Sequence, residues 1–413
     1  MPEPSLDVLR TALVVMGLST VTLAVGVYFL MQVRFSRDIA RQARRLMFAN
    51  LVVPPWDGKN LESLWASSTR EDREIIEEVL ADQSQFLGGK EAATFERAVA
   101  ECAIYGGLLH KLQLGPTFQK VHAAKMLGYF HDPRGIQALA NSIQDRTPEI
   151  ALACLISLGR LKSSSAIPAI IGFLQTRPAL VPDITIVATL SACALERPGS
   201  LAGLLDSNEE RLRIVGAWAI SEVADQTVLA SLLKAARDSH PEVRAKVARA
   251  LARAPNPTSV ETLISLAQDP VWFVRVRALD ALGQLHAPAG ETIALAALTD
   301  QVREVRYRAA FAVRQIKGMK GEVVVQTLTA GSRLSFDSLI SEWERAGFMD
   351  SVVDELSGQD GTRVDESKEI LRVLIAAGVT STLDYLVLVH RNIEVRLALL
   401  LLLLKNRDQS DRD

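Results

Sequence analysis

Small and apolar residues recur along the middle of the chain with a period of 31 residues. The positions that mark the period are Arg213, Arg244, Arg275 and Arg306, preceded at the same step by Ala151 and Lys120. Three positions after each marker stands a small or slim residue (Ala123, Cys154, Gly216, Val247, Ala278, Ala309), and seven positions after it an apolar one (Leu127, Leu158, Ile220, Leu251, Leu282, Val313). Positions i, i+3 and i+7 share one face of a helix. Each period is therefore predicted to begin with an amphipathic helix whose apolar face points inward.

A second helix is predicted in every period. A turn rich in proline, glycine, serine or asparagine separates the two helices, and the apolar register then resumes at Leu139, Ile170, Leu232, Leu263, Ala294 and Val325. Asp238, Asp269 and Asp300 close successive periods at the same step, whereas residues 181–206 fit only after a shift of one residue. One helical hairpin cannot bury both of its faces, but stacked hairpins share a continuous core. The pattern predicts such a stack.

Units that read D-x-x-x-E-V-R-x-x-A-x-x-A-L before a second helix resemble HEAT repeats of the short bacterial kind, over seven units from 116 to 331. The resemblance implies an all-α fold, a right-handed α-α superhelix of the armadillo-like type. It also implies that the recurring residues form a ladder of polar contacts between adjacent units. The residues of this ladder are Arg213, Arg244, Arg275, Arg306, Asp238, Asp269 and Asp300.

The flanking segments are expected to be helical but less regular. Residues 61–115 read as a divergent helical cap, residues 332–405 as irregular repeats that include Glu394-Val395-Arg396, and residues 406–413 as a polar tail.

A membrane-spanning helix is predicted at residues 11–33. These 23 residues carry no charge, and at about 1.5 Å per residue they are long enough for a hydrocarbon core of about 30 Å. A cleaved signal peptide would need a positive stretch before a shorter apolar run, and the order of charges here is the reverse.

The charges around this segment also predict its orientation. Residues 1–10 hold Glu3, Asp7 and Arg10, whereas the basic helix and linker at 34–60 begin with five arginines against Asp38 alone. By the positive-inside rule the amino terminus faces outward and the remainder faces the cytoplasm of an inner membrane. The arginines expected to face lipid headgroups are Arg34, Arg37, Arg41, Arg44 and Arg45.

Composition argues against several classes of function. The 413 residues have a net charge of -2, which gives no general attraction to nucleic acid. Aromatic residues make up 5% of the chain, a content typical of packed helices rather than of β-sandwiches or barrels. Cys102, Cys154 and Cys193 are isolated from each other and from metal-ligand spacing. No P-loop or HExxH motif is present. We therefore expect no enzyme activity, cofactor, metal, nucleic-acid partner or small-molecule substrate.

Three features are candidates for a binding surface. Trp272 and Phe273 begin a predicted first helix, where they could anchor a partner or fill the space between helical layers. Lys246, Arg277 and Arg308 form a basic stripe that is either ordinary solvated surface or a contact with anionic lipid. The leucine-rich run at 397–404 is too short to span a bilayer. We expect it to be core, the alternatives being that the membrane surface or another protein covers it.

The leading functional prediction is a membrane-anchored scaffold that binds a membrane-associated protein. By resemblance, it would be an accessory subunit of an envelope assembly such as a glycosyltransferase or transport machinery. The alternatives are a HEAT-like enzyme of the lyase type and a solenoid that binds anionic lipid.

Overall fold

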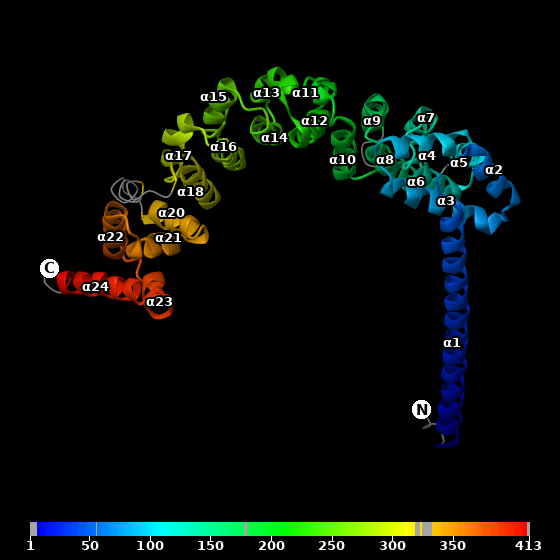
Figure 1. Cartoon of the computed structure of the whole chain (residues 1–413), viewed down its shortest axis with the longest axis horizontal. Coiled ribbons are helices and arrows are strands. Elements are labelled where there is room, and N and C mark those ends of the chain that lie inside the picture. Colours follow the sequence, from blue (N-terminus) through cyan, green and yellow to red (C-terminus); the bar gives the residue numbers. More distant parts are fainter. Residues whose placement is uncertain (1–5, 55, 177–179, 319–322, 324–332, 411–413) are drawn as a thin grey trace, which may run out of the picture. The chain divides into compact units, whose positions relative to one another are not determined.

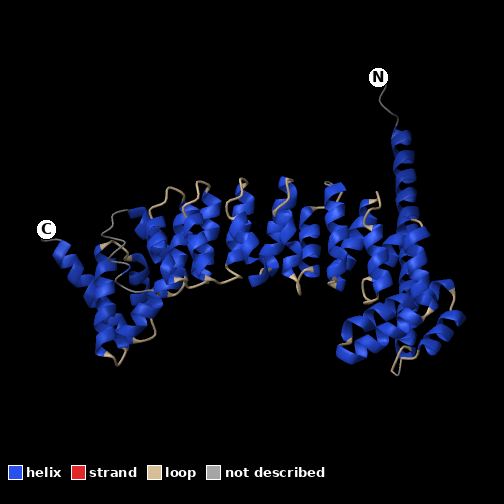
Figure 2. Ribbon diagram, turned by 90° about the horizontal axis from the view of Figure 1, so that it is seen from above, coloured by secondary structure: helices blue, strands red, loops and turns tan. Residues whose placement is uncertain are grey.

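The computed structural model describes residues 6–54, 56–176, 180–318, 323 and 333–410. Over these residues the chain consists of helices joined by turns, with no strand (Figures 1 and 2). The chain divides into two compact units, residues 1–185 and 186–413. The predicted all-helical fold class is confirmed for the described residues.

The first unit begins with a 46-residue helix, α1 (Leu6–Leu51). The following helices are α2 (Gly58–Ser67), α3 (Arg70–Phe86), α4 (Gly89–Glu101), α5 (Ala103–Leu114), α6 (Thr117–Leu127), α7 (Pro133–Ser142), α8 (Pro148–Leu161) and α9 (Ile167–Thr176). The carboxyl-terminal part of α1 packs on α3, while α5 packs on α6 and α6 on α8. Aromatic residues hold this core: Tyr105 and Phe130 are both buried and meet edge to face, with their ring centroids 6.2 Å apart.

Polar side chains cap the amino termini of several of these helices. Asp57 and Asp132 each accept a hydrogen bond from the backbone N–H two residues ahead, at α2 and α7. Thr69 does the same for the N–H of Asp72 in α3. Such side chains satisfy backbone donors that have no partner inside the helix.

In the second unit, successive first helices pack against one another. They are α12 (Glu210–Val223), α14 (Pro241–Leu251), α16 (Trp272–Gln284) and α18 (Arg303–Lys317). The helices paired with them are α11 (Ala202–Leu205), α13 (Leu229–Ala235), α15 (Pro257–Leu266) and α17 (Glu291–Ala297), and α10 (Asp183–Cys193) crosses the boundary between the units. The alternation of the two sets is visible in Figure 1.

The predicted apolar register is confirmed residue by residue. The residues seven positions after each marker are at most 1% exposed: Leu127, Leu158, Ile220, Leu251, Leu282 and Val313. In the second helices Leu139, Ile170, Leu232, Leu263 and Ala294 are fully buried. Val325, the last residue of that series, lies outside the described residues. The repeated stripe is therefore the core of the stack.

The end of the second unit is less regular. Its helices are α20 (Arg333–Arg345), α21 (Phe348–Asp354), α22 (Gly361–Ala376), α23 (Ser381–Val389) and α24 (Ile393–Ser410). Gly347, between α20 and α21, has a φ of 78°, a conformation that glycine adopts at no steric cost. The tight turn brings Trp343 and Phe348 edge to face at 4.8 Å.

In the part of the chain that the structure describes, no helix has both the length and the apolar character needed to cross a membrane. The predicted span at 11–33 falls partly outside that part, because the side chains of residues 11–15, 17, 18 and 21 are not described.

Candidate functional site

Paired Arg and Asp side chains join consecutive repeats of the second unit. Arg244 of α14 binds Asp269 through two hydrogen bonds, Nε to Oδ2 at 2.7 Å and Nη2 to Oδ1 at 2.9 Å. Arg213 binds Asp238 and Arg275 binds Asp300 in the same way, with Nε–Oδ2 distances of 2.7 and 2.8 Å. We call these three Arg-Asp pairs the rungs.

Each rung also fixes backbone. The free Nη1 of Arg244 donates to the carbonyl oxygens of Asp238 and Ser239, at 2.8 and 3.1 Å. Oδ1 of Asp269 accepts from the backbone N–H of Val271 at 2.9 Å, just before α16 begins. A rung therefore ties a first helix to the turn before it and to the start of the next repeat. Their repetition marks these residues as structural.

The rungs change the proton affinity of their carboxylates. Burial by itself raises the pKa of Asp269, but the hydrogen bonds from Arg244 and from the Val271 N–H, together with the charges of Arg244 and Arg275, outweigh it and lower the pKa. The pKa of Asp238 is lowered against the same burial effect by the hydrogen bonds from Arg213 and from the His240 N–H and by the charge of Arg213. These carboxylates are ionised at neutral pH, so they are suited to structural pairing and unsuited to general acid chemistry.

The ladder changes at its ends. Arg306 is buried, and its Nε lies 3.4 Å from the hydroxyl of Ser338. The residue 25 positions after it, where an aspartate would complete a rung, is Gly331, outside the described residues. In the first unit Lys120 lies 3.2 Å from Asp145 across the same 25-residue step, so a lysine supplies the cation there.

Trp272 and Phe273 differ in their surroundings. Both lie at the start of α16, and their rings meet edge to face with centroids 5.8 Å apart. Trp272 is 45% exposed, whereas Phe273 is half-buried. Trp272 thus presents an apolar surface to solvent, and Phe273 supports it.

The basic stripe is only partly available for binding. The Lys246 ammonium lies 4.4 Å from the ring centroid of Trp218, and desolvation by burial lowers its pKa. Arg308 pairs with Asp280 at 2.9 Å, while Arg277 is exposed. Sequence analysis did not identify Trp218, because Trp218 and Lys246 are not separated by the 31-residue period.

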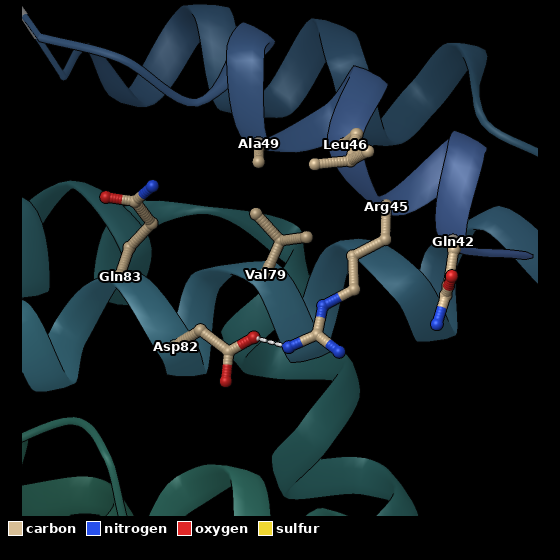
Figure 3. Close-up of a pocket in the computed structure, with 7 residues that line it drawn as sticks. All are labelled: Gln42, Arg45, Leu46, Ala49, Val79, Asp82 and Gln83. Carbon is tan, nitrogen blue, oxygen red and sulfur yellow. Dashed lines mark hydrogen bonds and ion pairs between the residues drawn. The ribbon is translucent and has the colours of Figure 1, made fainter.

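Three of the five arginines expected to face lipid bind protein instead. Arg41 lies 2.6 Å from Glu78 and Arg44 lies 3.3 Å from Asp72. Arg45 is paired with Asp82 (Figure 3). All three carboxylates belong to α3. The lipid-facing interpretation therefore stays a prediction for Arg34 and Arg37, which are exposed.

A cavity of about 330 Å³ lies where α1 meets α3. Leu46 and Ala49 of α1 and Val79 of α3 form its apolar wall, and the Arg45–Asp82 pair borders it (Figure 3). Because the charged side chains Arg45 and Asp82 at its border are already paired with each other, the cavity offers no obvious chemistry.

The leucine-rich run of α24 is divided between core and surface. Leu399 and Leu403 are buried, at 0% and 7% exposed. Four other leucines are exposed by 41–68%: Leu397, Leu400, Leu401 and Leu404. The expectation that the whole run is core is therefore wrong, because α24 has neighbours on only part of its circumference.

Reactive groups are not assembled in the described residues. Cys102, Cys154 and Cys193 are buried free thiols. Burial raises the pKa of Cys102 to about 11 and that of Cys154 to about 12, which suppresses the nucleophilic thiolate. No group of three or more His, Cys, Asp or Glu side chains suited to a metal ion occurs among these residues.

Comparison with known proteins finds that part of the second unit is similar to HEAT repeats. A family profile for HEAT repeats matches residues 198–283 and 229–317. No curated protein matches the chain. The match covers the three rungs and agrees with the helical hairpins described above. Residues 198–317 are thus similar to HEAT repeats, and the other residues that the structure describes are helical as well.

Solved structures with similarity to this chain include an engineered protein at 18% identity, covering 82% of this chain and 96% of its own, with a TM-score of 0.35. Human deoxyhypusine hydroxylase in complex with glycerol has 16% identity, covers 68% and 98%, and has a TM-score of 0.27. A designed armadillo repeat protein has 16% identity, covers 51% and 99%, and has a TM-score of 0.28.

Proposed function

We propose that this protein is a non-catalytic scaffold, held at the cytoplasmic face of a membrane by α1, that binds a membrane-associated protein partner. Repeated hairpins offer a long surface without a single reactive cleft. Three arginines and three aspartates of these hairpins are engaged in rungs, and the three cysteines of the chain are buried. These observations favour binding over catalysis.

The observation that carries the membrane proposal is the exposed apolar surface of α1. Leu23, Phe29 and Phe35 are 71%, 67% and 65% exposed, and residues 11–33 contain no charge. A long apolar surface that is exposed to water is unfavourable. Lipid would cover it, and Arg34 and Arg37 would then lie at the cytoplasmic headgroups.

The contact between α1 and α3 would connect such an anchor firmly to the rest of the first unit. The same helix that carries the apolar surface continues without a break to Leu51 and pairs with α3 through three arginines. Tethering would confine the search for a partner to a layer near the membrane and raise the effective concentration. An accessory subunit of an envelope assembly would need such tethering, because its partner would lie in the membrane.

Trp272 is the proposed centre of the partner surface. Partly exposed tryptophans are favoured anchors in protein interfaces. The lipid-binding alternative has less support, because Lys246 stacks on Trp218 and Arg308 is paired with Asp280. No observation favours the lyase-type enzyme.

Two measurements test the proposal. The full chain should remain with membranes after alkaline carbonate extraction, and replacing Leu23 and Phe29 by lysine should release it in folded form. A wild-type chain found in the soluble fraction would overturn the anchor. A photo-crosslinking residue at position 272 should capture one dominant membrane protein, whereas the same residue at Phe86, which is 88% exposed, should not. Equal capture from both positions would overturn the partner surface.

A further inference from the structure

A second cavity in the first unit, of about 570 Å³, lies among four helices. Trp65 of α2, Arg70 and Arg73 of α3, Lys111 of α5 and Phe118 of α6 contribute to its lining. The cavity therefore combines cationic and aromatic side chains from segments up to about 50 residues apart in the sequence.

One buried carboxylate organises two of its polar groups. The side chain of Glu77 is 0% exposed, and its two oxygens lie 2.7 Å from Lys111 Nζ and 2.9 Å from His122 Nε2. A buried carboxylate is stable only when such partners satisfy it. Glu77 thus holds Lys111 and His122 at the cavity and offsets the positive charge of Lys111.

The two arginines remain available. The Arg73 guanidinium lies 5.0 Å from the ring centroid of Trp65, and its buried Nε has no acceptor among the described residues. A buried donor without an acceptor is unfavourable. Arg70 is exposed in the first turn of α3 and forms no ion pair with any described carboxylate. Together they present guanidinium donors suited to a carboxylate.

Apolar surface lies beside these donors. Phe118 is 66% exposed, and a Cβ placed on Gly107 would meet nothing within 4 Å. An aliphatic or aromatic side chain has room to pack there. Glu74 also lines the cavity, and its negative charge disfavours a dianion such as a phosphate monoester more than a single carboxylate.

We propose that this cavity binds an acidic peptide segment of a partner protein. An aspartate or glutamate carboxylate accepts hydrogen bonds from Arg70 and Arg73, and the neighbouring apolar side chain of the peptide packs against Trp65 and Phe118. The residues of this site belong to the first unit and Trp272 belongs to the second, and the proposal does not depend on whether α1 enters a membrane.

The test uses the full chain in mild detergent and a short fluorescein-labelled peptide with a central Phe-Glu-Leu sequence, followed by fluorescence anisotropy. The expected result is saturable binding that weakens with added salt. The matching Phe-Gln-Leu peptide should bind at least tenfold more weakly, because it lacks the charge that guanidinium groups recognise. Arg73→Gln should weaken binding of the glutamate peptide by a similar factor.

Arg70→Gln serves as a second variant because Arg70 is exposed and its loss leaves the core unchanged; binding should again weaken severalfold. Arg146→Gln, an exposed arginine before α8, is the matched control and should bind as the wild type does. Equal binding of the two peptides, unchanged affinity in both pocket variants, or no binding by the folded wild type would overturn the proposal. Displacement of the peptide by glycerol 3-phosphate, a soluble headgroup that offers α1 no bilayer, with tighter binding than the peptide, would also overturn it and assign the cavity to a lipid headgroup.

Discussion

Residues 207–317 and residues 333–410 are both built of helical hairpins, but different interactions connect the hairpins in each region. In the first region the same Arg-Asp pair recurs with Nε–Oδ2 distances of 2.7–2.8 Å. In the second region the contacts are individual. Trp343 packs on Phe348, Thr382 donates to Glu344, and His390 lies 2.8 Å from Asp354.

The comparison of these two regions shows that a repeated sequence motif requires repeated geometry between neighbouring units. A contact repeats in sequence only when neighbouring units meet with the same geometry, because an Arg-Asp pair with two hydrogen bonds tolerates little displacement. Residues 333–410 bury their core with aromatic and aliphatic side chains, which impose weaker directional requirements. The stability of the two regions should therefore respond differently to comparable substitutions.

The largest expected effect follows removal of a rung carboxylate. Asp269→Ala leaves the Arg244 guanidinium without its partner and the Val271 N–H without its acceptor, and the side chains of this pair are only 6% and 13% exposed. Breaking a pair this buried should lower the free energy of unfolding by about 3 kcal/mol, measured by urea denaturation.

The matched control is Asp206→Ala, which removes an ion pair with Lys234 whose side chains are 52% and 75% exposed. The expected loss is less than about 0.5 kcal/mol. Equal losses of unfolding free energy in the two variants would show that the rungs stabilise the fold no more than an exposed ion pair does.

A smaller effect is expected from adding a methyl group where the repeats approach closely. A Cβ at position 216 would lie 2.5 Å from the Cβ of Leu204, so Gly216→Ala should destabilise by about 2 kcal/mol through overpacking. Gly361→Ala, in the irregular region, meets nothing within 4 Å and should be neutral or stabilise by up to about 1 kcal/mol. Thermal unfolding of the two variants measures the difference, and a neutral Gly216→Ala would mean that α11 and α12 separate freely.

The smallest effect concerns the surface of α24. Leu401 is 68% exposed, so Leu401→Ala should change the free energy of unfolding by less than about 0.5 kcal/mol. Leu399, two positions earlier, is fully buried, and Leu399→Ala should cost about 3 kcal/mol. Comparable losses from both changes, measured by urea denaturation, would place the exposed face of α24 in a core.

Much of the fold could be predicted because its signal is local and repeated. The 31-residue step placed Ile220, Leu251 and Leu282 in the core, where all three are fully buried. It also selected the arginines and aspartates that pair, since each partner lies at the same 25-residue distance.

The remainder depended on packing between elements that share no pattern. Arg34 and Arg45 look alike in the sequence, yet only Arg45 meets a carboxylate, because α3 covers one face of α1 over part of its length. Leu399 and Leu401 are equally apolar, and only their direction from α24 separates core from surface.

The sequence by itself determined the helical hairpin, its period, its buried stripe and the residues available for the rungs, because helix periodicity and repetition are properties of spacing along the chain. The tertiary structure alone decided which charges are paired and which apolar side chains are left exposed. It also brought Glu77, Lys111 and His122 together, three residues that no spacing rule connects. Those outcomes depend on which helices are neighbours in space, and burial and Coulomb interactions act between neighbours whatever their separation along the chain.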